Sequence, residues 1–236
     1  MKTQLLAQFA IHNAFRAAVA AGMIVSLLFA GFFLAEPRIS HGNDTADFYI
    51  RQTITDETSF LSDPTNVIMN GSISGITGGN ATGSSRFVVK SNNASGYYVE
   101  IDFFDNAGAW SMRGDEDGGA QLRDYGGDVA GEPSYNWTAS SASQFAYTIN
   151  SSTTADTDDS FLNNGSNTCN TGATQTFGKC WKAPSTTGFR VVDRSTAANT
   201  GATSTLYFKV NVPSSANPTP TAQTYTATAT LSVFTQ

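Results

Sequence analysis

Histidine is almost absent from this sequence. The 236 residues include His12 and His41 and no other imidazole, and both lie before residue 47. Ser-His-Asp and Cys-His nucleophilic arrangements and histidine metal triads all need an imidazole, so they are excluded from the rest of the chain. A paired-carboxylate hydrolase remains a formal alternative, although solvated loop charges explain the acidic residues between 100 and 132 better. We therefore expect a protein that is not an enzyme.

Charge is also scarce. Charged residues make up 14% of the chain, and the formal net charge is −6. The basic residues of the later part of the chain are scattered singly, for example at Arg86, Lys90, Arg113, Arg123, Arg190 and Lys209. Because phosphate backbones are bound by clustered lysine and arginine, nucleic acid is not an expected partner.

Cysteine is limited to Cys169 and Cys180, in a stretch without histidine. In an oxidising compartment such a pair forms a disulfide. A zinc site would need two further soft or imidazole ligands, which this stretch lacks. We therefore expect a disulfide between the two cysteines.

One long apolar run is present, at residues 17–35, and it reads AAVAAGMIVSLLFAGFFLA. As a helix it would extend about 28 Å, close to the hydrocarbon thickness of a bilayer. Lys2 and Arg16 precede it, which predicts a cytoplasmic segment at 1–16 and an exported remainder, with the membrane as a partner. Phe33 stands where a cleavage site has a small residue, so a cleaved signal peptide and a retained signal anchor are both left open. The body is accordingly expected to be extracytoplasmic, either anchored at the cell surface or secreted.

The remainder is expected to consist of a polar linker at 36–46 and one extracytoplasmic β domain at 47–236. Its apolar content comes mostly from Val, Ile, Phe and Tyr, which favours strands. Alternating or β-branched runs recur between turn residues, at 48–54, 67–76, 86–90, 97–104, 145–149, 189–192, 206–212 and 225–234. This spacing predicts an all-β fold, an antiparallel two-sheet sandwich of the Ig-like or Greek-key type. Long loop insertions are expected at 105–144 and 150–188.

The expected loops contain the candidate binding residues. Trp110, Trp137 and Trp181 could bind carbohydrate, although each ring could instead anchor its loop to the sheets. Two acidic clusters offer the oxygen ligands that calcium prefers, through Asp115 and Asp117 in one and Asp156 and Asp158 in the other. Neither cluster has the spacing of the twelve-residue calcium loop, and no other cofactor is expected.

Two segments resemble a known class of proteins. Residues 81–99 read ATGSSRFVVKSNNASGYYV, and residues 223–234 read QTYTATATLSVF. Both are similar to strands of secreted β-sandwich modules of bacterial surface proteins, of the WxL-like and spore-coat or fimbrial types. The resemblance covers about 30 residues and implies a surface or appendage role without a known reaction. The sequence has no Trp-x-Leu motif and no LPxTG sorting signal, so attachment to the cell wall by those routes is not supported.

The sequence therefore favours a non-enzymatic bacterial surface or secreted protein. We expect a structural or adhesin-like role, with self-assembly into a filament or coat as one form of it. The alternative is an extracellular carbohydrate-binding module that uses the loop aromatics.

Overall fold

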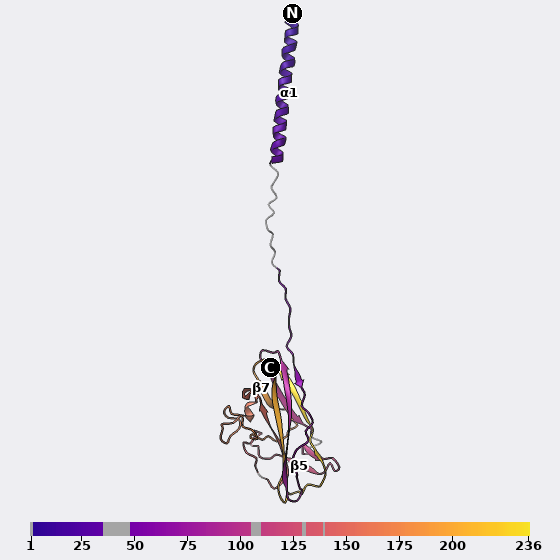
Figure 1. The fold of residues 1–236 in the computed structure, drawn as a ribbon, viewed down its shortest axis with the longest axis vertical. Helices are drawn as coiled ribbons and strands as arrows, with labels where there is room; N and C mark the ends of the chain where they lie inside the picture. The colour runs from indigo at the N-terminus through magenta and orange to yellow at the C-terminus, as the bar shows by residue number, and fades with distance from the viewer. Residues whose placement is uncertain (1, 35–47, 105–109, 129–130, 139) are drawn as a thin grey trace. The chain divides into compact units, whose positions relative to one another are not determined.

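The structure is a computed structural model, and it describes all residues except 1, 35–47, 105–109, 129–130 and 139. Its contacts divide the chain into two units, Met1–Thr53 and Ile54–Gln236 (Figure 1). The linker expected at 36–46 lies wholly outside the described residues. The second unit begins at Ile54, whereas we expected the β domain to start at residue 47.

The first unit contains one helix, α1, at Lys2–Leu34. The prediction of an N-terminal helix is confirmed, but the helix begins before the apolar run at 17–35. Among the residues whose side chains are described, no helical stretch has both the length and the apolar character of a membrane span. Those side chains in α1 cover residues 15–31, fewer than the roughly 20 residues that a span requires. This finding contradicts the predicted membrane anchor.

The second unit is built from strands. Its strands are β1 (Thr58–Ser62), β2 (Gly79–Ser91), β3 (Tyr97–Phe103), β4 (Met112–Gly114), β5 (Gln121–Asp124), β6 (Gln144–Ser151), β7 (Phe189–Arg194), β8 (Ala198–Val212), β9 (Tyr225–Thr226) and β10 (Ala229–Thr235). Two short 3₁₀ turns, η1 (Thr154–Asp156) and η2 (Asp159–Phe161), follow β6. The predicted all-β character is confirmed.

The strands form two sheets. The larger has the order β1-β2-β8-β6-β5-β4-β9, and the smaller has the order β10-β3-β7. Neighbouring strands are antiparallel except β5 and β6, which pair in parallel. The prediction of a purely antiparallel arrangement is therefore wrong at this pair, where β5 comes from the segment that we expected to be a loop.

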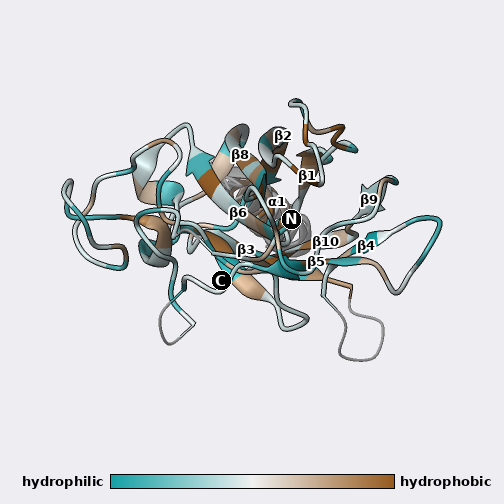
Figure 2. Cartoon of the chain, turned by 90° about the horizontal axis from the view of Figure 1, so that it is seen from below, coloured by the Kyte–Doolittle hydropathy of each residue, from teal (hydrophilic) through white to brown (hydrophobic). Residues whose placement is uncertain are grey.

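Alternation along the strands explains the core. In β3 every second side chain, from Tyr97 to Phe103, is buried, and the residues between them are only partly covered. These side chains pack with Phe87 and Val89 of β2 in a cluster that receives residues from both sheets. Figure 2 shows β3 and β10 on one side of this core and β2 and β8 on the other. Period-two burial thus decides which face of each strand is internal.

Two predicted strands are not formed. Residues 48–54 have no regular structure, and the segment at 67–76 makes only the isolated bridges of Asn70 with Thr82 and Ser74 with Gly78. A strand is stable only beside a partner, and no neighbouring strand runs along 48–54 among the described residues. The alternating apolar residues of 48–54 therefore belong to no sheet among the described residues.

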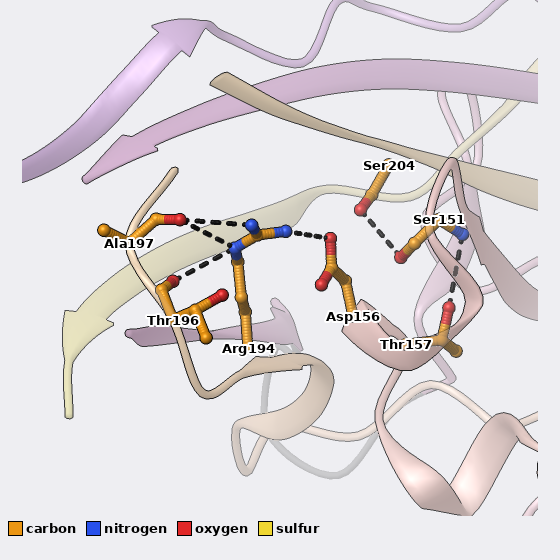
Figure 3. Close-up of polar contacts among 7 residues, drawn as sticks. All are labelled: Ser151, Asp156, Thr157, Arg194, Thr196, Ala197 and Ser204. Carbon is orange, nitrogen blue, oxygen red and sulfur yellow. Dashed lines mark hydrogen bonds and ion pairs between the residues drawn. The ribbon is translucent and has the colours of Figure 1, made fainter. Parts of the chain in front are cut away.

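A buried polar network fixes the segment after β6 (Figure 3). The Arg194 guanidinium lies 2.6 Å from an Asp156 carboxylate oxygen and also donates to the backbone carbonyls of Thr196 and Ala197. Nearby, the Ser151 hydroxyl contacts that of Ser204 across β6 and β8 at 2.9 Å. These contacts tie η1 to the end of β7, so this part of the expected loop is ordered.

We expect Arg194→Met to lower the free energy of unfolding by about 3 kcal/mol, because Asp156 would remain buried without its partner. The matched control is Arg190→Met, which removes the Arg190–Asp193 pair, where both side chains are about 40% exposed. Its loss should stay below about 1 kcal/mol. Urea unfolding of the two variants measures the difference, and equal losses would contradict the assigned role.

The pH dependence of stability should report the Tyr97 hydroxyl. Burial, followed by the nearby negative charge of Asp156, raises the pKa of Tyr97 to about 12, while Arg194 opposes the rise. The unfolded phenol has a pKa near 10, so the fold favours the neutral form. This contribution is complete below about pH 10 and is lost as the pH rises through about 12.

Tyr97→Phe should therefore flatten the loss of unfolding free energy between about pH 10 and 12, as measured by urea titrations at each pH. Tyr49→Phe is the control, because the Tyr49 side chain is 85% exposed. An unchanged slope in Tyr97→Phe would show that this phenol does not control alkaline stability.

Candidate functional site

The predicted tryptophans do not form one binding surface. Trp137 and Trp181 pack edge to face with ring centroids 5.6 Å apart, and Trp137 also lies 4.7 Å from the Tyr125 ring. The Lys209 ammonium sits over both indoles, 4.4 Å from the centroid of Trp137 and 5.6 Å from that of Trp181. Burial there lowers the pKa of Lys209. These two indoles anchor their loops to β8.

Trp110 stands apart from them. Its side chain is 43% exposed and borders a polar cavity of about 520 Å³ that Arg123, Asp124 and Gln144 also line. The buried Gln144 side-chain oxygen has no hydrogen-bond partner among the described residues. This cavity therefore combines an exposed aromatic ring with polar groups able to bind a hydroxylated ligand.

The predicted calcium ligands are mostly engaged in other contacts. Asp156 pairs with Arg194, Asp158 accepts from the backbone and hydroxyl of Ser160, and Asp117 accepts from the backbone N–H of Gly119. Asp115 is exposed, and its backbone N–H donates to Thr224. In the part of the chain that the structure describes, no group of three or more His, Cys, Asp or Glu side chains could hold a metal ion.

Cys169 and Cys180 form the predicted disulfide. Both are buried in the main core. The backbone N–H of Cys180 donates to the carbonyl of Tyr135, and Cys169 bridges Asn163. The bond therefore closes a loop within the 164–188 segment, and both of its cysteines pack in the core.

Another feature is an apolar groove of about 1050 Å³, which sequence reasoning missed. We define the groove by the residues that line it from both sheets and from two connecting segments. They include Ala81 and Ser85 of β2, Ile101 and Phe103 of β3, Leu206, Phe208, Val210 and Val212 of β8, Ala229 and Leu231 of β10, and residues of 64–76 and 219–227. None of the described lining residues is charged.

One wall of the groove is the incompletely covered face of β10. Ala229 and Leu231 stand opposite Phe103 and Ile101, so all four side chains project from the same face of the small sheet. Phe103 and Ile101 are buried, whereas Ala229 is exposed and Leu231 is half-buried. The core between the sheets is therefore open beside β10.

β10 is also an edge strand. Its one hydrogen-bonded neighbour among the described strands is β3; β1 lies close to it but does not pair with it. Unpaired edges of this kind are able to pair with another extended chain. An open apolar face and an unpaired backbone edge thus occur on the same strand.

The opposite rim is formed by residues 64–76, which connect β1 and β2. The Thr65 backbone exchanges two hydrogen bonds with the Ser85 hydroxyl, which attaches this segment to β2. Ile68 and Ile76 on the rim are 92% and 75% exposed. Contiguous exposed apolar surface of this type marks interaction sites.

The first unit supplies a second exposed apolar feature. The side chains of Phe48, Tyr49 and Ile50 are at least 80% exposed, and Ile54, where the second unit begins, is 82% exposed. The alternation that predicted a strand at 48–54 is the only sequence signal that bears on this site. This alternation predicted a strand, but it did not show that no neighbouring strand pairs with the segment.

Comparisons of the chain with protein-family models, curated proteins and solved structures find no match.

Proposed function

We propose that this protein is a non-enzymatic structural subunit of an extracytoplasmic surface assembly. The observation that carries the proposal is the unpaired edge of β10 beside the open apolar groove. An edge strand with an uncovered apolar face is a liability for a protein that remains alone. A subunit that associates through this edge converts the liability into an interface.

The architecture expected of such a subunit is an incomplete β-sandwich. The two sheets share one core, and residues of that core line the groove. Association at the edge of β10 would add backbone hydrogen bonds and would cover the exposed apolar side chains. We propose that the sandwich becomes complete only in the assembly.

Two further observations support an extracytoplasmic, non-catalytic role. The Cys169–Cys180 disulfide is typical of an oxidising compartment. The unit that contains the groove has no histidine, and the groove has no charged lining residue that could act as an acid or base. Its chemistry suits the burial of apolar side chains.

The self-association of the full chain tests this proposal. We expect light scattering to give a mass that rises above the 25.0 kDa of one chain with increasing concentration. Hydrogen exchange should show new protection of the β10 amides in the associated protein. A mild detergent should be present throughout, so that the exposed apolar side chains of α1 do not cause association themselves. A mass of one chain at every concentration would contradict the proposal.

A specific observation also favours a second function, carbohydrate binding at the cavity beside Trp110. Sugar rings pack on exposed aromatic faces while their hydroxyls bind polar groups, and Trp110, Arg123 and Gln144 provide both. Trp137 and Trp181 contribute nothing to this cavity.

A glycan array of the full chain tests this second function. We expect Trp110→Ala to reduce binding at least about tenfold, the equivalent of one lost aromatic contact of about 1.4 kcal/mol. Phe177→Ala is the control, because that side chain is 69% exposed and lies outside the cavity. An array without signal for the parent chain would exclude the function.

A further inference from the structure

We propose that Lys182 and Asp128 condense into an amide that covalently joins two connecting segments of the second unit. The bond forms between Lys182 Nζ and Asp128 Cγ, and one water leaves. This reaction goes beyond the proposed function and does not depend on it. Three observations support it: the contact between the two groups, their burial beside aromatic rings, and a buried phenol that lacks a hydrogen-bond partner.

The two reacting groups are already in contact. Lys182 Nζ lies 3.0 Å from Asp128 Oδ2, and within the part of the chain that the structure describes Lys182 makes no other ion pair. Since Oδ2 is bonded to Cγ, the nitrogen needs only a short displacement to reach the carbon that it attacks. Reacting groups held in place have effective concentrations of about 10⁵ M or more. The fold therefore favours the condensation.

The backbone fixes the direction of the Lys182 side chain. Lys182 and Tyr147 of β6 exchange two backbone hydrogen bonds of 3.1 and 2.8 Å, so their side chains project from the same face. That face belongs to the main core, which contains the buried Tyr147 ring. Asp128 reaches the same place from the segment that follows β5. The contact therefore joins segments that are 54 positions apart in the sequence.

The surroundings of the pair favour its neutral form. The two side chains are 7% and 17% exposed, and Lys182 Nζ lies 4.8 Å from the centroid of the Phe189 ring. Removing two charges from water costs free energy that their attraction only partly returns. Transfer of one proton from Lys182 to Asp128 gives an amine and a carboxylic acid, and the neutral amine is the nucleophile. The amide removes both buried charges.

The Tyr147 hydroxyl supplies a proton donor beside the carboxyl group. It is buried and has no hydrogen-bond partner among the described residues. Burial, with the charge of Asp128 adding to it, raises the pKa of Tyr147 well above its usual value, so the phenol keeps its proton. Because the charge of Asp128 affects this pKa, the two groups lie near each other. A donor in such a place stabilises the negative charge that develops on a carbonyl oxygen during attack.

The reaction balances without a further reactant. The Lys182 ammonium gives one proton to the Asp128 carboxylate, and the amine then attacks Cγ. The C–N bond forms and the C–OH bond breaks. The hydroxyl leaves with a second proton from the nitrogen, so one water is released and both charges disappear. Nothing is oxidised or reduced.

The amide connects parts of the chain that the disulfide does not. The Cys169–Cys180 bond closes a loop within one connecting segment, whereas Asp128 and Lys182 belong to different segments. A covalent bond between distant positions stabilises a fold by restricting the unfolded chain. Condensation therefore adds a second cross-link to the β domain, over a longer loop.

The mass of the intact full chain tests the proposal. After denaturation and reduction of the disulfide, we expect a mass lower than that of the sequence by one water. The double variant Lys182→Met with Asp128→Leu should have the full mass of its sequence. It leaves no buried charge unpaired, so it should fold.

Lys209→Met is the matched control, because the Lys209 ammonium also lies over aromatic rings but has no ion pair among the described residues. This variant should lack one water, like the parent. The three masses are compared with one another, so that any change common to all three chains cancels.

Digestion with trypsin locates the bond. Trypsin cleaves after free lysine, so the parent should stay uncut after Lys182 and should give a branched peptide that also contains Asp128. Water is also lost when an aspartate cyclises onto a following glycine, as at Asp117 and Gly118. That product would give no branched peptide and would persist in the double variant.

A parent chain with its full sequence mass after reduction would overturn the proposal and leave an ion pair only. A missing water that persists in the double variant would overturn it as well. Neither result depends on association at β10, so the proposed function stands or falls separately.

Discussion

Strand β8 pairs with β2 on one side and with β6 on the other. The β2–β8 ladder joins Gly79 to Val212 at one end and Ser91 to Ala198 at the other, so it brings together segments that are far apart in the sequence. The other strands of the second unit are arranged around this ladder. β3 follows β2 through a short turn and places the small sheet over it, and the core forms between them.

The long insertions are ordered because they contribute side chains to the core between the two sheets. The Arg194–Asp156 pair attaches η1 to β7, the disulfide closes a loop within one connecting segment, and the Trp137–Trp181 contact joins two connecting segments. Residues that first suggest ligand binding are therefore used for stability. Trp110 differs because its ring stays largely in solvent beside a polar cavity.

The two sheets leave one side of the core open beside β10. Ala229 and Leu231 lie opposite buried residues of β3, but Ala229 is exposed and Leu231 only half-buried. The exposed apolar residues at 48–54 have the complementary defect, since they have the pattern of a strand and no neighbour. Association at the edge of β10 would cover the side chains that the small sheet leaves exposed.

The sequence by itself determined the local features. Period-two alternation located β3, β6, β7, most of β10 and less than half of β2 and of β8, and the two cysteines identified their own disulfide. Only the tertiary structure decided that Trp137 and Trp181 meet each other, that β5 pairs in parallel with β6, and that residues 48–54 lack a partner. Alternation predicts that a strand has an inner and an outer face. It does not predict which strand will lie beside it. The groove lies where no further strand covers the apolar face of β10, so no local sequence pattern could have revealed it.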